Sequence, residues 1–210
     1  MINASSSGKT FDPVPAGTYV ARCYSMIHIG TIEEEYKGEK KETNKIRISW
    51  ELPTETKVFN EEKGEQPYTV SKEFTLSLHE KANLRKFLES WRGKGFNEEE
   101  AKMFDVTKLL GVPCMLSVIH KTSKQGRVYA DISSASTLPK GLTCPKIVNE
   151  IFEFSFDPFD RDKFESLPDW LKDKIKTSKE YKELINPQDK EAAPDEDEET
   201  DLNGDDNLPF

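Results

Sequence analysis

The chain has 210 residues, of which 35% are hydrophobic and 33% are charged, and its net charge is −9. This length suits one globular domain of ordinary size with extensions. The composition excludes a membrane-spanning helix, because no apolar run of about 18 residues occurs, and the N-terminus lacks the basic and apolar segments of a signal peptide.

The negative charge is concentrated at the C-terminus. Residues 187–210 hold ten acidic residues and one lysine, so residues 1–186 contain 29 acidic and 29 basic residues. A body that is neutral overall can still carry a basic face if its acids lie elsewhere. The low isoelectric point therefore does not exclude nucleic acid as a partner.

The first predicted strand follows a Ser- and Gly-rich start, residues 1–14, that we expect to be flexible. The stretch "TYVARCYSMIHIG" alternates with period two, which indicates a half-buried strand. One side carries Ala21, Cys23, Ile27 and Ile29, and the other carries Arg22, Tyr24, Met26 and His28. The charged segment "TIEEEYKGEKKETNK" that follows predicts an exposed loop.

Two more strands are predicted next. In "KIRISWELP" the inward residues are Ile46, Ile48, Trp50 and Leu52, the outward residues are Lys45, Arg47 and Ser49, and Pro53 is expected to end the strand. After a polar loop at 54–66, "YTVSKEFTLSLH" predicts a third strand with Val70, Phe74, Leu76 and Leu78 in phase. Lys72 shares this apolar phase, which indicates a strand end or a bulge.

Helical spacing then replaces the alternation. In "EKANLRKFLESWRGKG" apolar residues recur every three or four positions, and Gly93 and Gly95 are expected to end the helix. A second short helix is predicted in "NEEEAKMFDVTKLLG", with Asn97 as its N-cap. The stretches "VPCMLSVIHKT" and "GRVYADISSAS" predict the last two strands, around a basic turn.

These elements predict a mainly β fold. Three strands, a helical insert and two strands follow the order of an OB-fold-like five-stranded barrel, with the insert between strands 3 and 4. The expected domains are a flexible N-terminus (1–14), a barrel (15–138), a helical C-terminal extension (139–186) and a disordered acidic tail (187–210). The extension must pack against the barrel or against a second copy of the chain.

One face of the predicted barrel combines cations with rings, which suits unpaired nucleic acid because cations neutralise phosphates and rings stack on bases. The loops on either side of this face could close over the strand. The predicted nucleic-acid-binding residues are Arg22, Tyr24, His28, Tyr36, Lys37, Lys40, Lys41, Lys45, Arg47, Lys121, Lys124, Arg127 and Tyr129. Taken alone, this set fits an ordinary solvated sheet face at least as well. Trp50 and Trp91 are assigned to the core.

The acidic tail ends in "DDNLPF", and a segment needed only for solubility has no use for a terminal aromatic residue. A ring with a free carboxylate suits a partner pocket that is apolar and lined by basic side chains. The predicted partner-binding residues are Asp205, Asp206, Leu208, Pro209 and Phe210. The same polyanion could fold back and compete for the basic face of the chain.

This tip is similar to the C-terminal tip of bacterial single-stranded DNA-binding proteins. The layout of barrel, helical extension and acidic tail resembles the DNA-binding proteins of tailed bacteriophages, and "FDPVPAGTYVARC" resembles the opening of phage replication-associated proteins. The resemblance implies a phage protein in the cytoplasm of the bacterial host that coats single-stranded DNA in replication or recombination. Its tail would recruit replication enzymes. This chain differs from the bacterial proteins in two respects: Asn207 stands where they have an acidic residue, and the part of the chain before the tail is longer than theirs.

No residue pattern indicates catalysis, so we expect a protein that is not an enzyme. The three histidines are scattered, and neither a metal site nor a cofactor is predicted. The three cysteines are odd in number and far apart in the sequence, which favours buried thiols over disulfides or metal ligands. An adaptor whose acidic tail mimics DNA or keeps the chain in solution is an alternative, and a nuclease or recombination subunit is a third. The oligomeric state, including a homo-oligomer, stays open.

Overall fold

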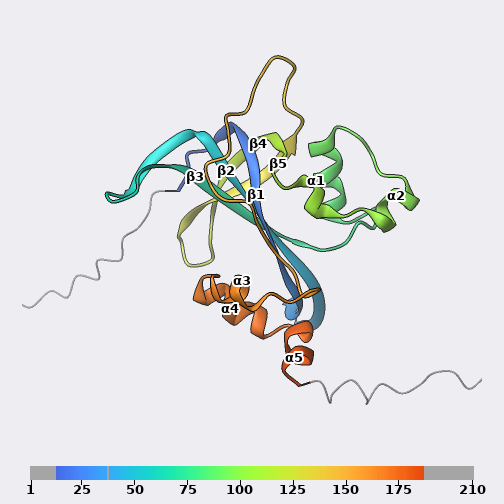
Figure 1. Ribbon diagram of the computed structural model, residues 1–210. Coiled ribbons are helices and arrows are strands. Elements are labelled where there is room, and N and C mark those ends of the chain that lie inside the picture. Colours follow the sequence, from blue (N-terminus) through green and yellow to red (C-terminus); the bar gives the residue numbers. More distant parts are fainter. Residues whose placement is uncertain (1–12, 37, 187–210) are drawn as a thin grey trace, which may run out of the picture.

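The computed structural model describes residues 13–36 and 38–186 (Figure 1). Its sheet has five strands along one path, β3–β2–β1–β4–β5, and a short sixth strand beside β1. The strands are β1 (Gly17–Tyr36), β2 (Glu39–Asn60), β3 (Gly64–Thr75), β4 (Pro113–Thr122), β5 (Val128–Ser136) and β6 (Phe152–Phe154). The five strands of the path pair antiparallel and form a curled half-barrel.

The helices form two groups. Between β3 and β4 lie α1 (Asn83–Arg92), α2 (Glu98–Met103) and the short 3-10 helix η1 (Val106–Leu109). After β6 come α3 (Arg161–Glu165), α4 (Asp169–Lys176) and α5 (Lys179–Ile185). Figure 1 shows α1 beside β5, α2 farther out beyond α1, and the C-terminal helices at the far end of the β1–β2 hairpin. None of the helices in residues 13–36 and 38–186 is long and apolar enough to span a membrane.

The first core lies inside the half-barrel. The predicted inward residues of β2 are buried, from Ile46 at 4% exposure to Trp50 at 0%, and Trp91 of α1 is 2% exposed. The rings of Trp50 and Trp91 lie 5.6 Å apart, centroid to centroid. The assignment of both tryptophans to the core is confirmed.

The helix ends follow the sequence signals. Gly93 ends α1 in the left-handed conformation at φ 65°, which glycine adopts without the steric cost of a Cβ atom. The Asn97 side chain accepts a hydrogen bond from the backbone N–H of Glu100 at 2.7 Å and caps α2. Both predictions are confirmed.

Two segments predicted as loops are strands. β1 runs on to Tyr36 and β2 begins at Glu39, so "TIEEEYKGEKKETNK" forms a hairpin around Gly38, whose φ is 84°. Its acids and bases neutralise each other across the pair, as in the Lys40–Glu33 bridge of 2.8 Å. The sequence shows that this segment is densely charged. It does not show that the charges pair across two strands, which is why the segment was predicted as a loop.

Pro53 does not end β2, and residues 54–66 are not one loop. β2 continues to Asn60 through an irregularity in the register between Leu52 and Thr56, and β3 starts at Gly64. A bulge tolerates a proline because the ladder hydrogen bond is already interrupted there.

Lys72 is neither at a strand end nor at a bulge. It lies within β3, opposite Ile48 of β2. Its ammonium group donates to the Asp131 carboxylate at 3.1 Å and to the backbone carbonyl of Ile132 in β5. The lysine therefore links the two outer strands of the curled sheet, β3 and β5, in an apolar phase where a charge needs such partners.

A second core lies on the far part of β1. The β1–β2 register shifts between Cys23 and Ser25 and again between His28 and Gly30. Met26 is consequently buried in the first core, on the opposite side from its prediction, and the residues after it turn to another cluster. That second cluster contains Ile27, Ile29, Ile32, Phe154, Phe164, Leu167, Leu171 and Ile175.

The C-terminal extension completes this second core. β6 pairs parallel with β1, joining Ser25 to Phe152 and Ile27 to Phe154. Leu171 and Ile175 of α4 are 1% and 0% exposed. Of the two packing arrangements that the sequence left open, the structure shows packing against the chain's own sheet.

The cysteines are free thiols. Cys23 and Cys114 are buried and Cys144 is partly buried. Burial raises the pKa of all three thiols, that of Cys114 to about 12, because the thiolate loses its hydration.

Candidate nucleic-acid interface

Arg22 does not lie on an open face. Its guanidinium donates to the backbone carbonyls of Gly111 at 2.6 Å, Pro145 at 3.0 Å and Cys144 at 3.3 Å. Three carbonyl partners fix the side chain and tie the segment 139–151 to the sheet. Arg22 points outward from the strand, as the sequence predicted. The segment 139–151 of the same chain, however, packs over this part of the sheet.

His28 is covered in the same way. Its Nε2 atom lies 2.7 Å from Oδ1 of Asn44, and its ring forms a T-shaped pair with the ring of Phe156 at 5.2 Å between centroids. Phe156 belongs to the C-terminal extension. Arg22 and His28 are therefore occupied by contacts within the chain, which the strand pattern alone did not reveal.

Tyr24 and Arg47 are brought together, as predicted. They line a hollow of about 440 Å³ between the outward faces of β1, β2 and β3 and the start of α4. Trp170 of α4 lines the same hollow, with the Arg47 guanidinium carbon 4.9 Å from the centre of its ring. Burial raises the pKa of the Tyr24 hydroxyl and lowers that of Arg47, which stays a cation at neutral pH.

The residues predicted in the first loop belong to the β1–β2 hairpin. Lys40 is exposed and paired with Glu33, and Lys41 is exposed opposite Glu34 in the register. The Lys45 ammonium lies 2.5 Å from the Glu34 carboxylate. The side chain of Tyr36 and all of Lys37 lie outside the described residues.

The β4–β5 turn exposes the remaining predicted residues. Lys121 is bonded to Asp131, whereas Lys124 and Arg127 are exposed and form no ion pair within the described part of the chain. Tyr129 is 43% exposed and lies opposite Lys121 in the register. A cationic turn with an accessible ring is thus present where the sequence predicted it.

A basic groove that the sequence did not predict lies between β3, the start of α1 and β5. It has a volume of about 760 Å³, and its floor includes Phe74 and Phe87. The lysines that line it are Lys45, Lys72, Lys81 and Lys86. Among the described residues, Lys81 and Lys86 have no ion-pair partner.

The electrostatic balance around the basic groove is positive. The charged residues that line it, together with their ion-pair partners, comprise six cations and three carboxylates. The cations are Lys45, Arg47, Lys72, Lys81, Lys86 and Lys174, and the carboxylates are Glu34, Glu73 and Asp131. A neutral body therefore does carry a positive surface, because its other acids are placed elsewhere.

The sequence offered one signal for this groove. "HEKANLRK" places Lys81 and Lys86 around the first turn of α1, but which strands face that turn depends on the curl of the sheet.

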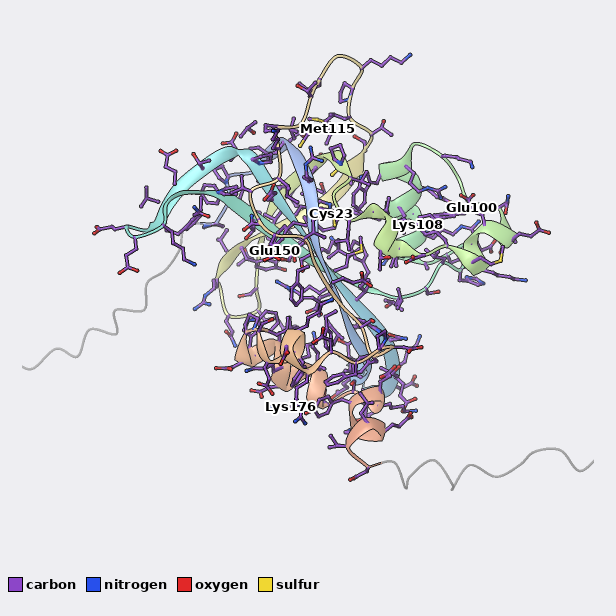
Figure 2. All side chains as sticks on the ribbon, in the orientation of Figure 1. Cys23, Glu100, Lys108, Met115, Glu150 and Lys176 are labelled. Carbon is purple, nitrogen blue, oxygen red and sulfur yellow. The ribbon has the colours of Figure 1, made fainter. Side chains whose placement is uncertain are left out.

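Figure 2 shows Glu100 and Lys108 with the helices beside β5 and Lys176 with the C-terminal helices, in separate parts of the molecule.

The predicted partner-binding residues of the tail lie outside the described residues; they are Asp205, Asp206, Leu208, Pro209 and Phe210. Within the part that is described, no group of three His, Cys, Asp or Glu side chains is arranged to hold a metal ion. The chain matches no family model, and no curated protein matches it at a significant level.

Proposed function

We propose that the chain is a single-stranded DNA-binding protein with an OB-type barrel. The observation that carries this proposal is the basic groove, where six cations meet three carboxylates, together with the exposed ring of Tyr129 on β5, one of the strands beside the groove. Lysines neutralise phosphates and release counterions, a sequence-independent source of affinity. An aromatic ring accepts any base, so binding is largely independent of sequence.

The curled sheet supports the OB-type interpretation. The strand order is β3–β2–β1–β4–β5, and Lys72 links the two outer strands, β3 and β5. The same pairs of strands are adjacent in a five-stranded barrel of the OB type. The position of α1, α2 and η1 between β3 and β4 is consistent with the helical insert that this interpretation requires.

The biological setting that we propose rests on the resemblance of the tail and of the layout. The protein coats unpaired phage DNA during replication or recombination in the cytoplasm of the bacterial host. It recruits replication enzymes through Asp205, Asp206, Leu208, Pro209 and Phe210 and performs no catalysis itself.

The proposal is tested by titrating labelled oligo(dT) and duplex DNA into the full chain at several salt concentrations. We expect oligo(dT) to bind more tightly and its affinity to fall steeply with salt. Removing Lys81 and Lys86 together by alanine substitution should weaken binding about 5- to 20-fold at low salt and reduce the salt slope by roughly 1.4, two contacts of about 0.7 each. These two lysines are chosen because neither forms an ion pair in the described part of the chain. Their removal therefore leaves no carboxylate without a partner.

Lys102→Ala is the matched control, because Lys102 is exposed on α2 and forms no ion pair in the described part of the chain. It should bind as the native chain does. Salt-independent binding, or no binding of oligo(dT), would reject the proposal and favour the adaptor. Metal-dependent cleavage of the oligonucleotide would favour a nuclease.

A further inference from the structure

α4 holds one tryptophan at the surface of the sheet. Two residues of this helix, Leu171 and Ile175, are buried in the second core, whereas Trp170 keeps 52% of its surface exposed. The other two tryptophans are buried in the first core. The packing of the helix therefore fixes the position of Trp170 and leaves about half of its surface exposed, with the Arg47 guanidinium over the ring at 4.9 Å from its centre.

The hollow beside Trp170 has the size and lining of a ligand site. Its volume of about 440 Å³ lies within the range of small-molecule pockets, about 300–1,000 Å³. Tyr24 and Arg47 share it with Trp170, and the hydroxyl groups of Ser49 and Ser71 lie within it, 2.9 Å apart. Rings, hydroxyl groups and a cation together suit a flat polar ring that carries a phosphate.

Arg47 is available to an anion. Its guanidinium lies 3.7 Å from the Glu73 carboxylate, a loose contact, while the Lys174 ammonium holds the same carboxylate at 2.5 Å. Glu73 is therefore neutralised chiefly by Lys174. Arg47 can form a charge-assisted hydrogen bond to a phosphate without leaving that carboxylate unpaired.

The hollow lies next to the basic groove, at the 3.7 Å contact between Arg47 and Glu73. Glu73 lines the basic groove, and its partner Arg47 lines the hollow. On β2, Lys45 and Arg47 lie two positions apart in a strand and so point to the same face. A nucleic-acid strand that follows the lysines of the groove meets Trp170 next.

We propose that Trp170 is a base-stacking residue, and that the hollow receives one unpaired nucleobase with its phosphate beside Arg47. This inference rests on the proposed function and adds to it a residue from outside the barrel. The C-terminal extension thereby covers the predicted sites at Arg22 and His28 and contributes a stacking platform of its own.

Tryptophan fluorescence isolates this site, because Trp50 and Trp91 are 0% and 2% exposed. Oligo(dT) should quench the emission of the native chain and shield it from iodide. Trp170→Phe should abolish both effects while keeping a ring and the fold. Quenching that persists in Trp170→Phe would overturn the inference.

Affinity gives the second readout. Trp170→Ala should weaken oligo(dT) binding about 5- to 50-fold, as expected for one stacked base, and Trp170→Phe should weaken it less. The salt slope should stay unchanged, because no cation is removed. Leu184→Ala, which alters another exposed apolar residue at 45% exposure on α5, is the control and should bind normally.

An oligonucleotide with abasic sites completes the test. The native chain should bind it more weakly than oligo(dT), and Trp170→Ala should discriminate less between the two. Equal discrimination by both chains would overturn the stacking role. If the native chain binds DNA through Lys81 and Lys86 and Trp170→Ala has no effect, only this inference fails, whereas absence of any binding rejects the proposed function.

Discussion

At the scale of single residues, charged groups on the sheet bind the chain's own backbone. Arg22 and Glu51 lie opposite each other in the β1–β2 register. Glu51 is fully buried and accepts hydrogen bonds from the backbone N–H groups of Val148 at 3.0 Å and Asn149 at 2.8 Å. The Arg22 guanidinium donates hydrogen bonds to the backbone carbonyls of Cys144 and Pro145 in the same segment. These hydrogen bonds offset the burial of the Glu51 carboxylate and of the terminal nitrogens of Arg22, so both groups anchor the segment 139–151.

A prediction at this scale concerns Cys114, whose pKa is raised to about 12 by burial. Above pH 9 the unfolded thiol loses its proton while the folded thiol keeps it, so the stability of the native chain falls as pH rises. Between about pH 8 and about pH 10 this thiol alone should lower the free energy of unfolding by about 1.4 kcal/mol. The free energy of unfolding of both chains is measured by guanidinium titration at the two pH values. Its decrease from the lower to the higher pH should be smaller in Cys114→Ala than in the native chain by that amount, and an equal decrease in the two chains would contradict the prediction.

At the scale of elements, β1 serves two cores. Its register shifts at Cys23/Ser25 and His28/Gly30 rotate successive stretches of the strand toward different clusters. A bulge inserts a residue and reverses which side of the sheet the following side chains face. The C-terminal helices therefore complete a core that the strand begins.

The prediction at this scale is that Leu171→Ala destabilises the whole chain. Leu171 is 1% exposed in the second core, so its truncation should cost about 2–4 kcal/mol from lost burial and the cavity that remains. Urea unfolding, followed by far-ultraviolet circular dichroism and by tryptophan emission, should show coincident transitions shifted together. Leu184→Ala, at an exposed position, should cost under about 0.5 kcal/mol. A separate early transition would instead show that the extension unfolds on its own.

At the scale of the whole molecule, charge is segregated along the chain. Ten acids lie in residues 187–210, while the cations of the basic groove outnumber its carboxylates. Opposite charges on one chain attract over about a Debye length, roughly 10 Å at moderate salt. We therefore propose that the tail competes with DNA for the groove and also serves as the ligand for partner proteins.

Deletion of residues 187–210 tests this competition. We expect the shortened chain to bind oligo(dT) about 3- to 10-fold more tightly at low salt, with the gain fading as salt screens the tail. It should also lose capture of replication enzymes in a pull-down. Deleting Phe210 alone should abolish capture and leave DNA affinity unchanged. Weaker DNA binding by the shortened chain would refute the competition.

The sequence predicted the elements with a strong local signal. The alternation at Ile46, Ile48 and Trp50 and the glycine after α1 depend only on neighbouring residues, and both were interpreted correctly. The hairpin extensions were missed because their charges neutralise each other only across paired strands. Met26 and Lys72 were misplaced because bulges and the link between β3 and β5 involve residues far apart in the chain.

The candidate site was predicted in part. Tyr24 and Arg47 share one hollow, and the β4–β5 turn is cationic. Lys81, Lys86 and Trp170 were not predicted as site residues, because no strand pattern places a helix residue beside a sheet.

The amino-acid order by itself determined the alternating strands, the capped helices, the neutral body and the anionic end, since each of these depends on residues close together in the chain. The tertiary structure decided which cations stay accessible. Curling of the sheet brought β3, α1 and β5 around one groove, and packing of the extension on β1 enclosed Arg22 and His28 while holding Trp170 at the surface. Accessibility depends on what covers a side chain, and the residues of the extension that contact Arg22 and His28 lie more than a hundred positions away in the sequence.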